Sequence, residues 1–382
     1  MNKFSVIVII IISFFSCKKS NVLVLSPNIE KNLCESAYLN KSLKSDYTVT
    51  TFIDSTIQNL ATKELLGVLE QFEAESGFVM IMETKTGQIK AMASLVEGEK
   101  LEFVNSKVID ATIPIEPGSL NKTFNMMSLL EDKKSDTSLV YNANGGEKIF
   151  YGVKIQDVKK GYESISLKRA FAISSNVVFA QAIDSAYRDN PNQYINNYKN
   201  FGLNQDLDLP FNSKISSTIP SPKSNTWSKI ALPFMGIGYG LTLKPIQILT
   251  YFNAIGNNGV LIKPNFLSRI TSSKDSRSKK YSTTILNNEI YFKATIKIIQ
   301  YLLKNAVSTD SKKLQIAGQA AEITLDYAEP NKSRQVASTF VGYFSKNNSK
   351  YTMMVYIKKP KNRLKNHLNI AEKLMGEIVE KI

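Results

Sequence analysis

The sequence predicts an α+β fold in which an antiparallel sheet has helices packed beside it. Apolar runs at residues 78–82 and 88–95 enclose a turn that contains Gly87, and this pattern is typical of a β-hairpin. Two more strand-like runs follow much later, at residues 338–344 and 351–357. Between these pairs, apolar residues recur at helical spacing. A hairpin near each end and helices in the middle are the basis of the prediction.

Residues 1–17 have the features of an export signal. A positively charged start precedes an apolar run at residues 4–15, which is too short to span a bilayer comfortably. The run ends just before Cys17, as in the sites where bacterial lipoproteins are lipidated and cut, although Phe14 stands where leucine is usual. We therefore expect an exported protein held on a membrane by acyl chains on Cys17. An ordinary signal peptide with an incidental cysteine is the alternative.

The segment after the signal, residues 18–45, is polar and unpatterned, and we expect it to be a tether. One folded domain is expected over residues 46–382, because a chain with 43% hydrophobic residues can bury a large core. Within it, residues 49–56 have the pattern of a strand. Residues 57–69 have apolar side chains at helical spacing and predict the first helix.

The middle of the domain predicts helices with polar breaks between them. Apolar residues at helical spacing predict a helix over residues 120–130, and another is expected at residues 167–172. Residues 174–176, which read Ser-Ser-Asn, separate this helix from the next one. A polar, lysine-rich stretch at residues 272–284 predicts a surface loop. An amphipathic helix over residues 364–378 is expected to close the chain.

Charge and composition restrict the class of function. The formal net charge is +15, and on an exported protein such a surface favours anionic polymers of the cell envelope over nucleic acid. Lipidation of Cys17 would leave Cys34 without an intrachain partner, so we expect no disulfide. His367 is the only histidine, which excludes a metal site built from several histidines. We expect no metal and no other cofactor.

Ser119 and Lys122 are the first candidates for chemistry. They lie three residues apart behind Pro117 and Gly118, so on a helix their side chains share one face. A serine hydroxyl is a weak nucleophile, and a lysine can accept its proton only if burial or a nearby positive charge lowers the pKa of the ammonium group. The alternative is a serine that caps the helix beside a solvated lysine.

Further motifs, in their order along the chain, resemble the transpeptidase domain of the class B penicillin-binding proteins. The resemblance covers about residues 47–360. It implies an antiparallel sheet flanked by helices plus an all-helical subdomain, as in the serine β-lactamases. The motifs that carry it are Thr51-Phe52-Ile53-Asp54-Ser55, the hairpin at residues 82–94, Glu116-Pro117-Gly118-Ser119, Ser174-Ser175-Asn176, Gly238-Tyr239-Gly240, Asn257-Asn258-Gly259-Val260 and Phe340-Val341-Gly342-Tyr343.

The resemblance implies a role for each residue of the site. Ser119 would be the acylated nucleophile and Lys122 its general base, while Ser174 would relay protons and Asn176 would contact the substrate amide. The implied reaction is D,D-transpeptidation, the cross-linking of peptidoglycan stem peptides in the cell envelope. It identifies no protein partner. The alternative for residues 174–176 is helix capping alone.

Two departures keep the function open. The Lys-Thr-Gly motif of the family is replaced by Gln319, Ala320 and Ala321, followed by Glu322, so hydrogen bonding survives without the positive charge. Lys312, Lys313 and Lys332 are candidate replacements for that charge. The large pedestal domain of class B proteins is also expected to be missing. The hypotheses are a transpeptidase or carboxypeptidase with altered carboxylate recognition, a catalytically inactive scaffold or binding protein, and a β-lactam sensor or hydrolase.

Overall fold

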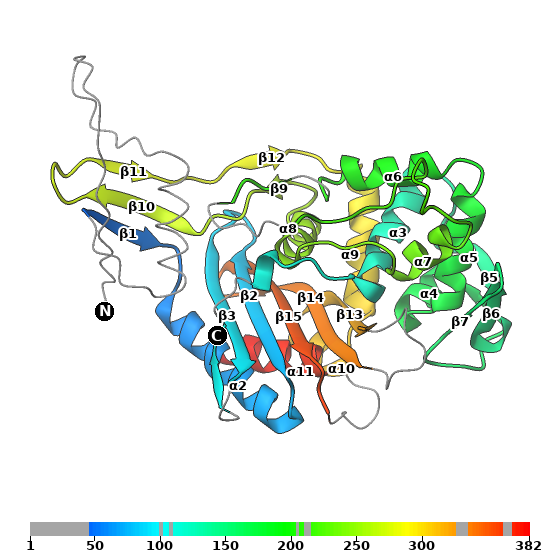
Figure 1. Cartoon of the computed structure of the whole chain (residues 1–382), viewed down its shortest axis with the longest axis horizontal. Coiled ribbons are helices and arrows are strands. Elements are labelled where there is room, and N and C mark those ends of the chain that lie inside the picture. Colours follow the sequence, from blue (N-terminus) through cyan, green and yellow to red (C-terminus); the bar gives the residue numbers. More distant parts are fainter. Residues whose placement is uncertain are drawn as a thin grey trace, which may run out of the picture.

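The computed structural model of the chain is built around a six-stranded antiparallel sheet with the strand order β13-β14-β15-β2-β3-β4 (Figure 1). The strands are β2 (Ser76–Glu83), β3 (Ile89–Glu97), β4 (Phe103–Asn105), β13 (Ala317–Thr324), β14 (Val336–Lys346) and β15 (Ser349–Lys358). Strand β15 pairs with β2, so the two ends of the domain form one sheet. Both predicted hairpins and the α+β fold are confirmed.

The structure describes residues 46–98, 102–106, 110–203, 206–209, 215–325, 335–361 and 369–382. The predicted signal, the tether and His367 lie outside these ranges. Among the described residues, no helix is both long enough and apolar enough to cross a membrane.

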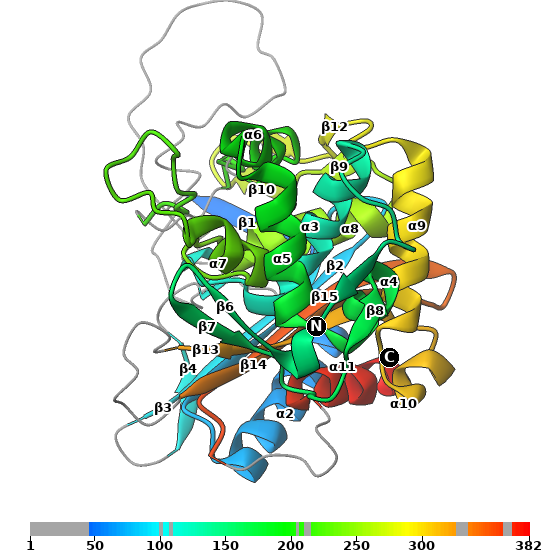
Figure 2. The ribbon, with the colours of Figure 1, turned by 90° about the vertical axis from the view of Figure 1, so that its right-hand side faces the viewer.

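Helices α2 (Ser55–Phe72) and α11 (Ile370–Lys381) cover one face of the sheet (Figures 1 and 2). Helix α2 begins where the Asp54 carboxylate accepts hydrogen bonds from the backbone N–H groups of Thr56, at 2.9 Å, and Ile57, at 3.1 Å. The prediction of a strand through residue 56 was therefore wrong, because the side chain of Asp54 starts a helix there. The predicted closing helix is present in its second half, and residues 362–368 lie outside the described part.

The opposite face carries a helical subdomain (Figure 2). Its helices are α3 (Asn121–Glu131), α4 (Leu167–Ile173), α5 (Asn176–Tyr187), α6 (Pro191–Asn200), α7 (Ala231–Ile237), α8 (Pro245–Gly256) and α9 (Lys293–Asn305). All residues of α8 are buried, and its polar Asn253 accepts a hydrogen bond from Thr352 of β15 at 2.8 Å. The subdomain also carries two short antiparallel pairs that the sequence did not predict, β5 (Val140–Asn142) with β8 (Ser164–Ser166) and β6 (Glu147–Phe150) with β7 (Val153–Gln156).

A separate small sheet with the order β1-β10-β11 lies at one end of the molecule (Figure 1). It consists of β1 (Tyr47–Thr51), β10 (Leu267–Ser272) and β11 (Ser278–Lys280). The prediction of a loop over residues 272–284 was wrong at β11, whose polar residues pair with β10 through the backbone. Such pairing leaves no apolar pattern in the sequence, because an edge strand needs hydrogen bonds rather than burial.

Candidate active site

The structure brings the four predicted catalytic residues together around the amine of Lys122. Ser119 lies in the 3₁₀ turn η2 (Gly118–Leu120), and Lys122 follows in the first turn of α3. The Lys122 Nζ is 2.8 Å from Ser119 Oγ, 3.0 Å from Ser174 Oγ, 2.7 Å from the Ser174 carbonyl oxygen and 2.6 Å from Asn176 Oδ1. We call these four residues the Lys122 cluster. A neutral amine has a lone pair that can accept a proton from either serine hydroxyl while its two N–H groups donate.

Burial controls the protonation of this amine. The side chain of Lys122 is completely buried, and its desolvation lowers the pKa from 10.5 to about 7. The carboxylate of Asp157 acts in the opposite direction, because a nearby negative charge favours the ammonium form. Near neutral pH, a large fraction of Lys122 is therefore the free amine, which is the form that can accept a proton from Ser119.

The Ser174–Asn176 segment is a sharp link between two helices. Helix α4 ends at Ile173 and is capped by Ser174, which adopts a left-handed conformation with φ of 56°. Helix α5 begins directly afterwards, and this reversal turns both polar side chains toward Lys122. The Nδ2 of Asn176 also donates to the Gln156 carbonyl oxygen at 2.8 Å. This contact assigns the amide orientation in which Oδ1 faces Lys122.

Asp157 supports this link and was not singled out from the sequence. It follows β7 and is buried, with 5% exposure. Its carboxylate accepts hydrogen bonds from Ser175 Oγ at 2.8 Å and from the Val177 N–H at 2.9 Å. Both donors belong to the turn that carries Ser174 and Asn176. Local sequence carries no signal for this role, because it depends on contact between a loop and a distant helix end.

Two glycines allow the nucleophile turn to pack. The N–H of Gly118 donates to the Gly238 carbonyl oxygen at 3.0 Å, and a Cβ on Gly238 would lie 1.9 Å from the carbonyl oxygen of Gly118. A Cβ on Gly118 would lie 2.9 Å from Ile323 Cγ1 of β13. Glu116 accepts a hydrogen bond from the Gly240 N–H at 2.9 Å, and burial raises the pKa of its carboxyl group. Through these contacts, the segment that precedes Ser119 is fixed against the segment of Gly238 and Gly240.

Gln319, Ala320 and Ala321 lie on β13, the strand at the edge of the sheet. They pair with residues 339–341 of β14. The side chain of Gln319 is buried; its Nε2 donates to the Ala320 carbonyl oxygen at 3.3 Å, and its Oε1 has no hydrogen-bond partner among the described residues. No hydrogen bond within the described part of the chain joins these three side chains to the Lys122 cluster.

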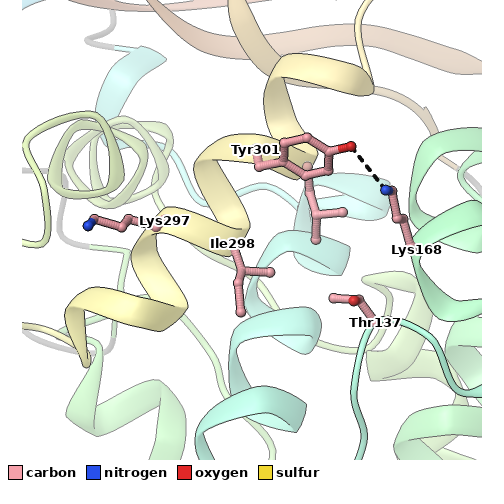
Figure 3. A pocket seen from close by; sticks show the side chains of 6 residues that line it. Thr137, Lys168, Lys297, Ile298 and Tyr301 are labelled. Carbon is pink, nitrogen blue, oxygen red and sulfur yellow. Dashed lines mark hydrogen bonds between the residues drawn. The ribbon is translucent and has the colours of Figure 1, made fainter.

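A separate pocket of about 280 Å³ lies between α4 and α9 (Figure 3). In it, Lys168 Nζ donates to the Tyr301 hydroxyl at 3.0 Å and lies 4.6 Å from the centre of the ring. Its lining residues are Thr137, Lys168, Lys297, Ile298, Tyr301 and Leu302. None of them belongs to the Lys122 cluster or to β13, so we treat this pocket as distinct from the candidate active site.

The model of the penicillin binding protein transpeptidase domain matches residues 77–380. The chain therefore belongs to this family, as its motifs predicted. It is 25% identical over 254 residues to the probable peptidoglycan D,D-transpeptidase PbpC of Pseudomonas aeruginosa, a match that covers 65% of this chain and 44% of that protein. It is 27% identical over 223 residues to the peptidoglycan D,D-transpeptidase FtsI of Escherichia coli, covering 54% of this chain and 35% of that protein. The chain thus aligns with less than half the length of these two relatives.

Solved structures show the same fold. The apo transpeptidase domain of penicillin-binding protein 3 from Burkholderia pseudomallei superimposes with a TM-score of 0.70 at 19% identity, covering 86% of this chain and 94% of that one. Penicillin-binding protein 3 of Mycobacterium tuberculosis, also in its apo form, gives a TM-score of 0.73 at 19% identity, covering 88% of this chain and 78% of that one.

Proposed function

We propose that the protein is a serine acyltransferase of cell-wall synthesis that acts on peptidoglycan stem peptides as a D,D-transpeptidase. The single observation that carries this proposal is the contact between the buried amine of Lys122 and Ser119 Oγ, at 2.8 Å, together with the lowered pKa of that amine. The names of the relatives support the choice of substrate.

The reaction has two halves. Ser119 Oγ attacks the carbonyl carbon of the donor peptide and transfers its proton to the neutral amine of Lys122. The bond to the terminal residue breaks, and the leaving amine takes a proton relayed through Ser174. An acceptor amine then attacks the acyl-enzyme and forms the new amide, the bond to Ser119 Oγ breaks, and the proton that the acceptor amine loses passes through Lys122 to Ser119 Oγ. Asn176 binds the donor amide, and backbone N–H groups near Ser119 and on β13 stabilise the oxyanion.

The proposal includes a location in the cell envelope. Residues 1–17 direct export, Cys17 carries the lipid anchor, residues 18–45 form the tether and residues 46–382 form the catalytic domain. A Cys17→Ser variant is expected to leave the membrane fraction after cell lysis and to lose incorporation of a labelled fatty acid. If the variant stayed in the membrane fraction and still incorporated the fatty acid, the lipid anchor on Cys17 would be contradicted. The catalytic proposal would be unaffected.

A second candidate function is a catalytically inactive scaffold of the envelope. It is favoured by β13, where Gln319, Ala320 and Ala321 stand in place of the Lys-Thr-Gly of the family. These side chains retain one hydrogen-bonding group and no charge. In this candidate, the protein keeps the fold, loses substrate recognition and acts by binding rather than by catalysis.

Intact-mass spectrometry separates the two candidates. The protein is incubated with several β-lactams and with a small thioester donor, beside Ser119→Ala and Lys122→Met. A covalent adduct on the wild type that is absent from Ser119→Ala supports the acyltransferase. No adduct with any reagent, from a protein whose thermal unfolding shows that it is folded, would make the scaffold the better conclusion.

A further inference from the structure

Two asparagines of α3 face two tyrosines of α6 inside the helical subdomain. Asn121 and Asn125 lie four residues apart on α3, so their side chains share one face of that helix. Tyr194 and Tyr198 lie four residues apart on α6 in the same way. All four side chains have 0% exposure. We call these four residues the Asn-Tyr cluster.

The Asn-Tyr cluster is joined by a continuous series of hydrogen bonds. Asn121 Nδ2 donates to the Tyr198 hydroxyl at 2.8 Å, and the same hydroxyl lies 3.1 Å from Asn121 Oδ1. The hydroxyls of Tyr198 and Tyr194 are 3.0 Å apart, and the Tyr194 hydroxyl donates to Asn125 Oδ1 at 2.6 Å. Burial raises the pKa of both tyrosine hydroxyls, that of Tyr198 to about 12, so both are neutral near pH 7.

Both asparagine amides also hold the end of α7. Asn121 Nδ2 donates to the Met235 carbonyl oxygen at 2.6 Å, and Asn125 Nδ2 donates to the Gly236 carbonyl oxygen at 2.8 Å. The last carbonyl groups of a helix lack the partner that a further turn would supply, so donors from another helix are favourable there. Helix α3 therefore caps the end of α7 through two buried side chains.

Ser119 lies between two attachments to the end of α7. On one side the Gly118 N–H donates to the Gly238 carbonyl oxygen at 3.0 Å, and on the other side the Asn121 amide reaches the last turn of α7. For acylation, Ser119 Oγ has to stay close to the Lys122 amine, from which it lies 2.8 Å. A turn that is attached on both sides of Ser119 has little freedom to move away from that amine.

We propose that Asn121 is a positioning residue for Ser119, and that Tyr198 acts through Asn121 by holding its amide in the orientation that reaches α7. The inference rests on the proposed acyl transfer at Ser119 and adds to it two residues that exchange no proton with the donor. Their effect is on geometry, because a shift of about 1 Å between reacting groups can lower a rate on the order of a hundredfold.

The first experiment compares Asn121→Ala with Asn253→Ala. Asn253 is the matched control, because it is also completely buried in a helix, donates to the Thr84 carbonyl oxygen at 3.1 Å and accepts from Thr352 at 2.8 Å. Both substitutions remove a buried amide that makes at least two hydrogen bonds, so both should lower the melting temperature. Only Asn121 lies beside the nucleophile turn.

Acylation of Ser119 by a thioester donor is followed by intact mass, well below the melting temperature of every variant. Varying the donor concentration gives the limiting rate and the half-saturating concentration. Asn121→Ala is expected to lower the limiting rate at least about tenfold and to change the half-saturating concentration by less than about threefold. Asn253→Ala is expected to keep the limiting rate within about twofold of the wild type.

The pH profile of the limiting rate separates positioning of Ser119 from an effect on Lys122. The Lys122 amine remains buried in Asn121→Ala, so the acid limb is expected to stay at the same pH while the plateau falls. A shift of the limb with an unchanged plateau would place the effect on Lys122 and overturn the assignment to Ser119.

A second pair of variants tests the role of Tyr198 and decides the matter if Asn121→Ala does not fold. Tyr198→Phe removes only the hydroxyl and is expected to lower the limiting rate roughly 3- to 10-fold. Its control is Tyr187→Phe, because the Tyr187 hydroxyl is equally buried and donates to Asp132 at 2.8 Å. The control should stay within about twofold of the wild type.

The double variant Asn121→Ala/Tyr198→Phe tests whether the tyrosine acts through the asparagine. The double variant is expected to be no slower than Asn121→Ala alone, because the hydroxyl then has no amide to orient. Losses that multiply would mean that Tyr198 acts independently of Asn121, which overturns that part of the proposal.

The outcomes distinguish this inference from the proposed function. A wild-type protein that is acylated at Ser119, beside Asn121 and Tyr198 variants that are acylated as fast as their controls, overturns the positioning role and leaves the acyltransferase intact. A wild-type protein that forms no Ser119 adduct overturns the proposed function and this inference with it.

Discussion

Lys122 combines complete burial with four close polar contacts, and this combination sets its chemistry. In water a lysine is almost entirely an ammonium ion at pH 7, and it cannot accept a proton. Desolvation brings the pKa of Lys122 to about 7, so a modest change in pH converts one form into the other. Activity and stability should both depend on this one group.

The rate of Ser119 acylation is expected to rise about tenfold per pH unit below pH 7 and to level off above it. The reason is that only the free amine of Lys122, whose pKa is lowered to about 7, can accept the serine proton. The check is the rate of adduct formation measured between about pH 5 and 9 with a donor that does not titrate. A flat profile over this range would exclude Lys122 as the base.

Burial of Lys122 also makes stability depend on pH. The folded-state pKa of about 7 lies below the unfolded value of 10.5, so the unfolded chain binds more protons between these values and stability rises with pH there. Relative to Lys122→Met, the wild type should gain on the order of 4 kcal/mol in unfolding free energy from pH 7 to pH 10.5. Denaturant unfolding of both proteins across this window measures the difference. A constant difference would contradict the lowered pKa.

Asp157 is expected to position the Ser174 turn. Its negative charge is also expected to keep the pKa of Lys122 higher than burial alone would make it. In Asp157→Asn, loss of the negative charge should move the acid limb of the acylation profile to lower pH. Loss of charge-assisted contacts to Ser175 and the Val177 N–H should cost about 1–3 kcal/mol of stability. A purely structural role would lower stability without moving the limb.

The control for this prediction is Glu147→Gln, which neutralises a partly exposed carboxylate on the adjoining strand β6. Its ion pair with Lys154, at 2.6 Å, lies at the surface, where such pairs contribute little. The control should leave both the acid limb and the unfolding free energy nearly unchanged. A limb that moves equally in both variants would indicate a general effect of net charge.

At the scale of elements, the nucleophile turn η2 depends on the segment that leaves α7. Gly238 adopts φ of +85° and its Cα lies against the Gly118 carbonyl, where a side chain has no room. Gly238→Ala should therefore displace η2, lower the melting temperature clearly and remove most Ser119 acylation. Thermal unfolding and adduct formation are the two measurements.

Gly240→Ala is the matched control. Gly240 also has a positive φ, of +74°, but nothing lies within 4 Å of a Cβ placed there. The substitution carries only the conformational cost of a left-handed residue, about 1–2 kcal/mol. If it impaired acylation as strongly as Gly238→Ala, contact with Gly118 would not be the cause.

Elements with strong periodicity could be predicted from the sequence, and those that depend on distant contacts could not. The hairpin of β2 and β3 and the helix after Ser119 follow from patterns of burial that repeat within a few residues. Strand β11 is polar and pairs with β10 only through its backbone. Asp157 is one carboxylate in a loop, and its importance appears only when the loop meets the start of α5. The positions of Ser119, Lys122, Ser174 and Asn176 could be predicted, while the residues that orient them could not.

At the scale of the whole molecule, the candidate site lies where the two parts of the fold meet. The edge strand β13 belongs to the sheet, and the Ser174 turn belongs to the helical subdomain (Figures 1 and 2). The tyrosine hydroxyl of Tyr239 accepts a hydrogen bond from the Thr324 N–H at 3.0 Å and so ties the end of β13 to the subdomain. Leu120 and Phe124, which follow Ser119, pack into the same core as Ala321 and Ile323 of β13, so one continuous core supports both sides of the candidate site.

The net charge of +15 leads to a prediction for the molecule as a whole. The protein is expected to bind purified cell walls through their anionic polymers, and binding should fall by more than about tenfold between roughly 50 and 300 mM salt, because screening weakens attraction between exposed charges. Sedimentation with walls before and after removal of these polymers tests it, with Ser119→Ala as a control that should bind equally. Binding that survives both high salt and polymer removal, and that is lost in Ser119→Ala, would mean that the protein is held by its active site rather than by its charge.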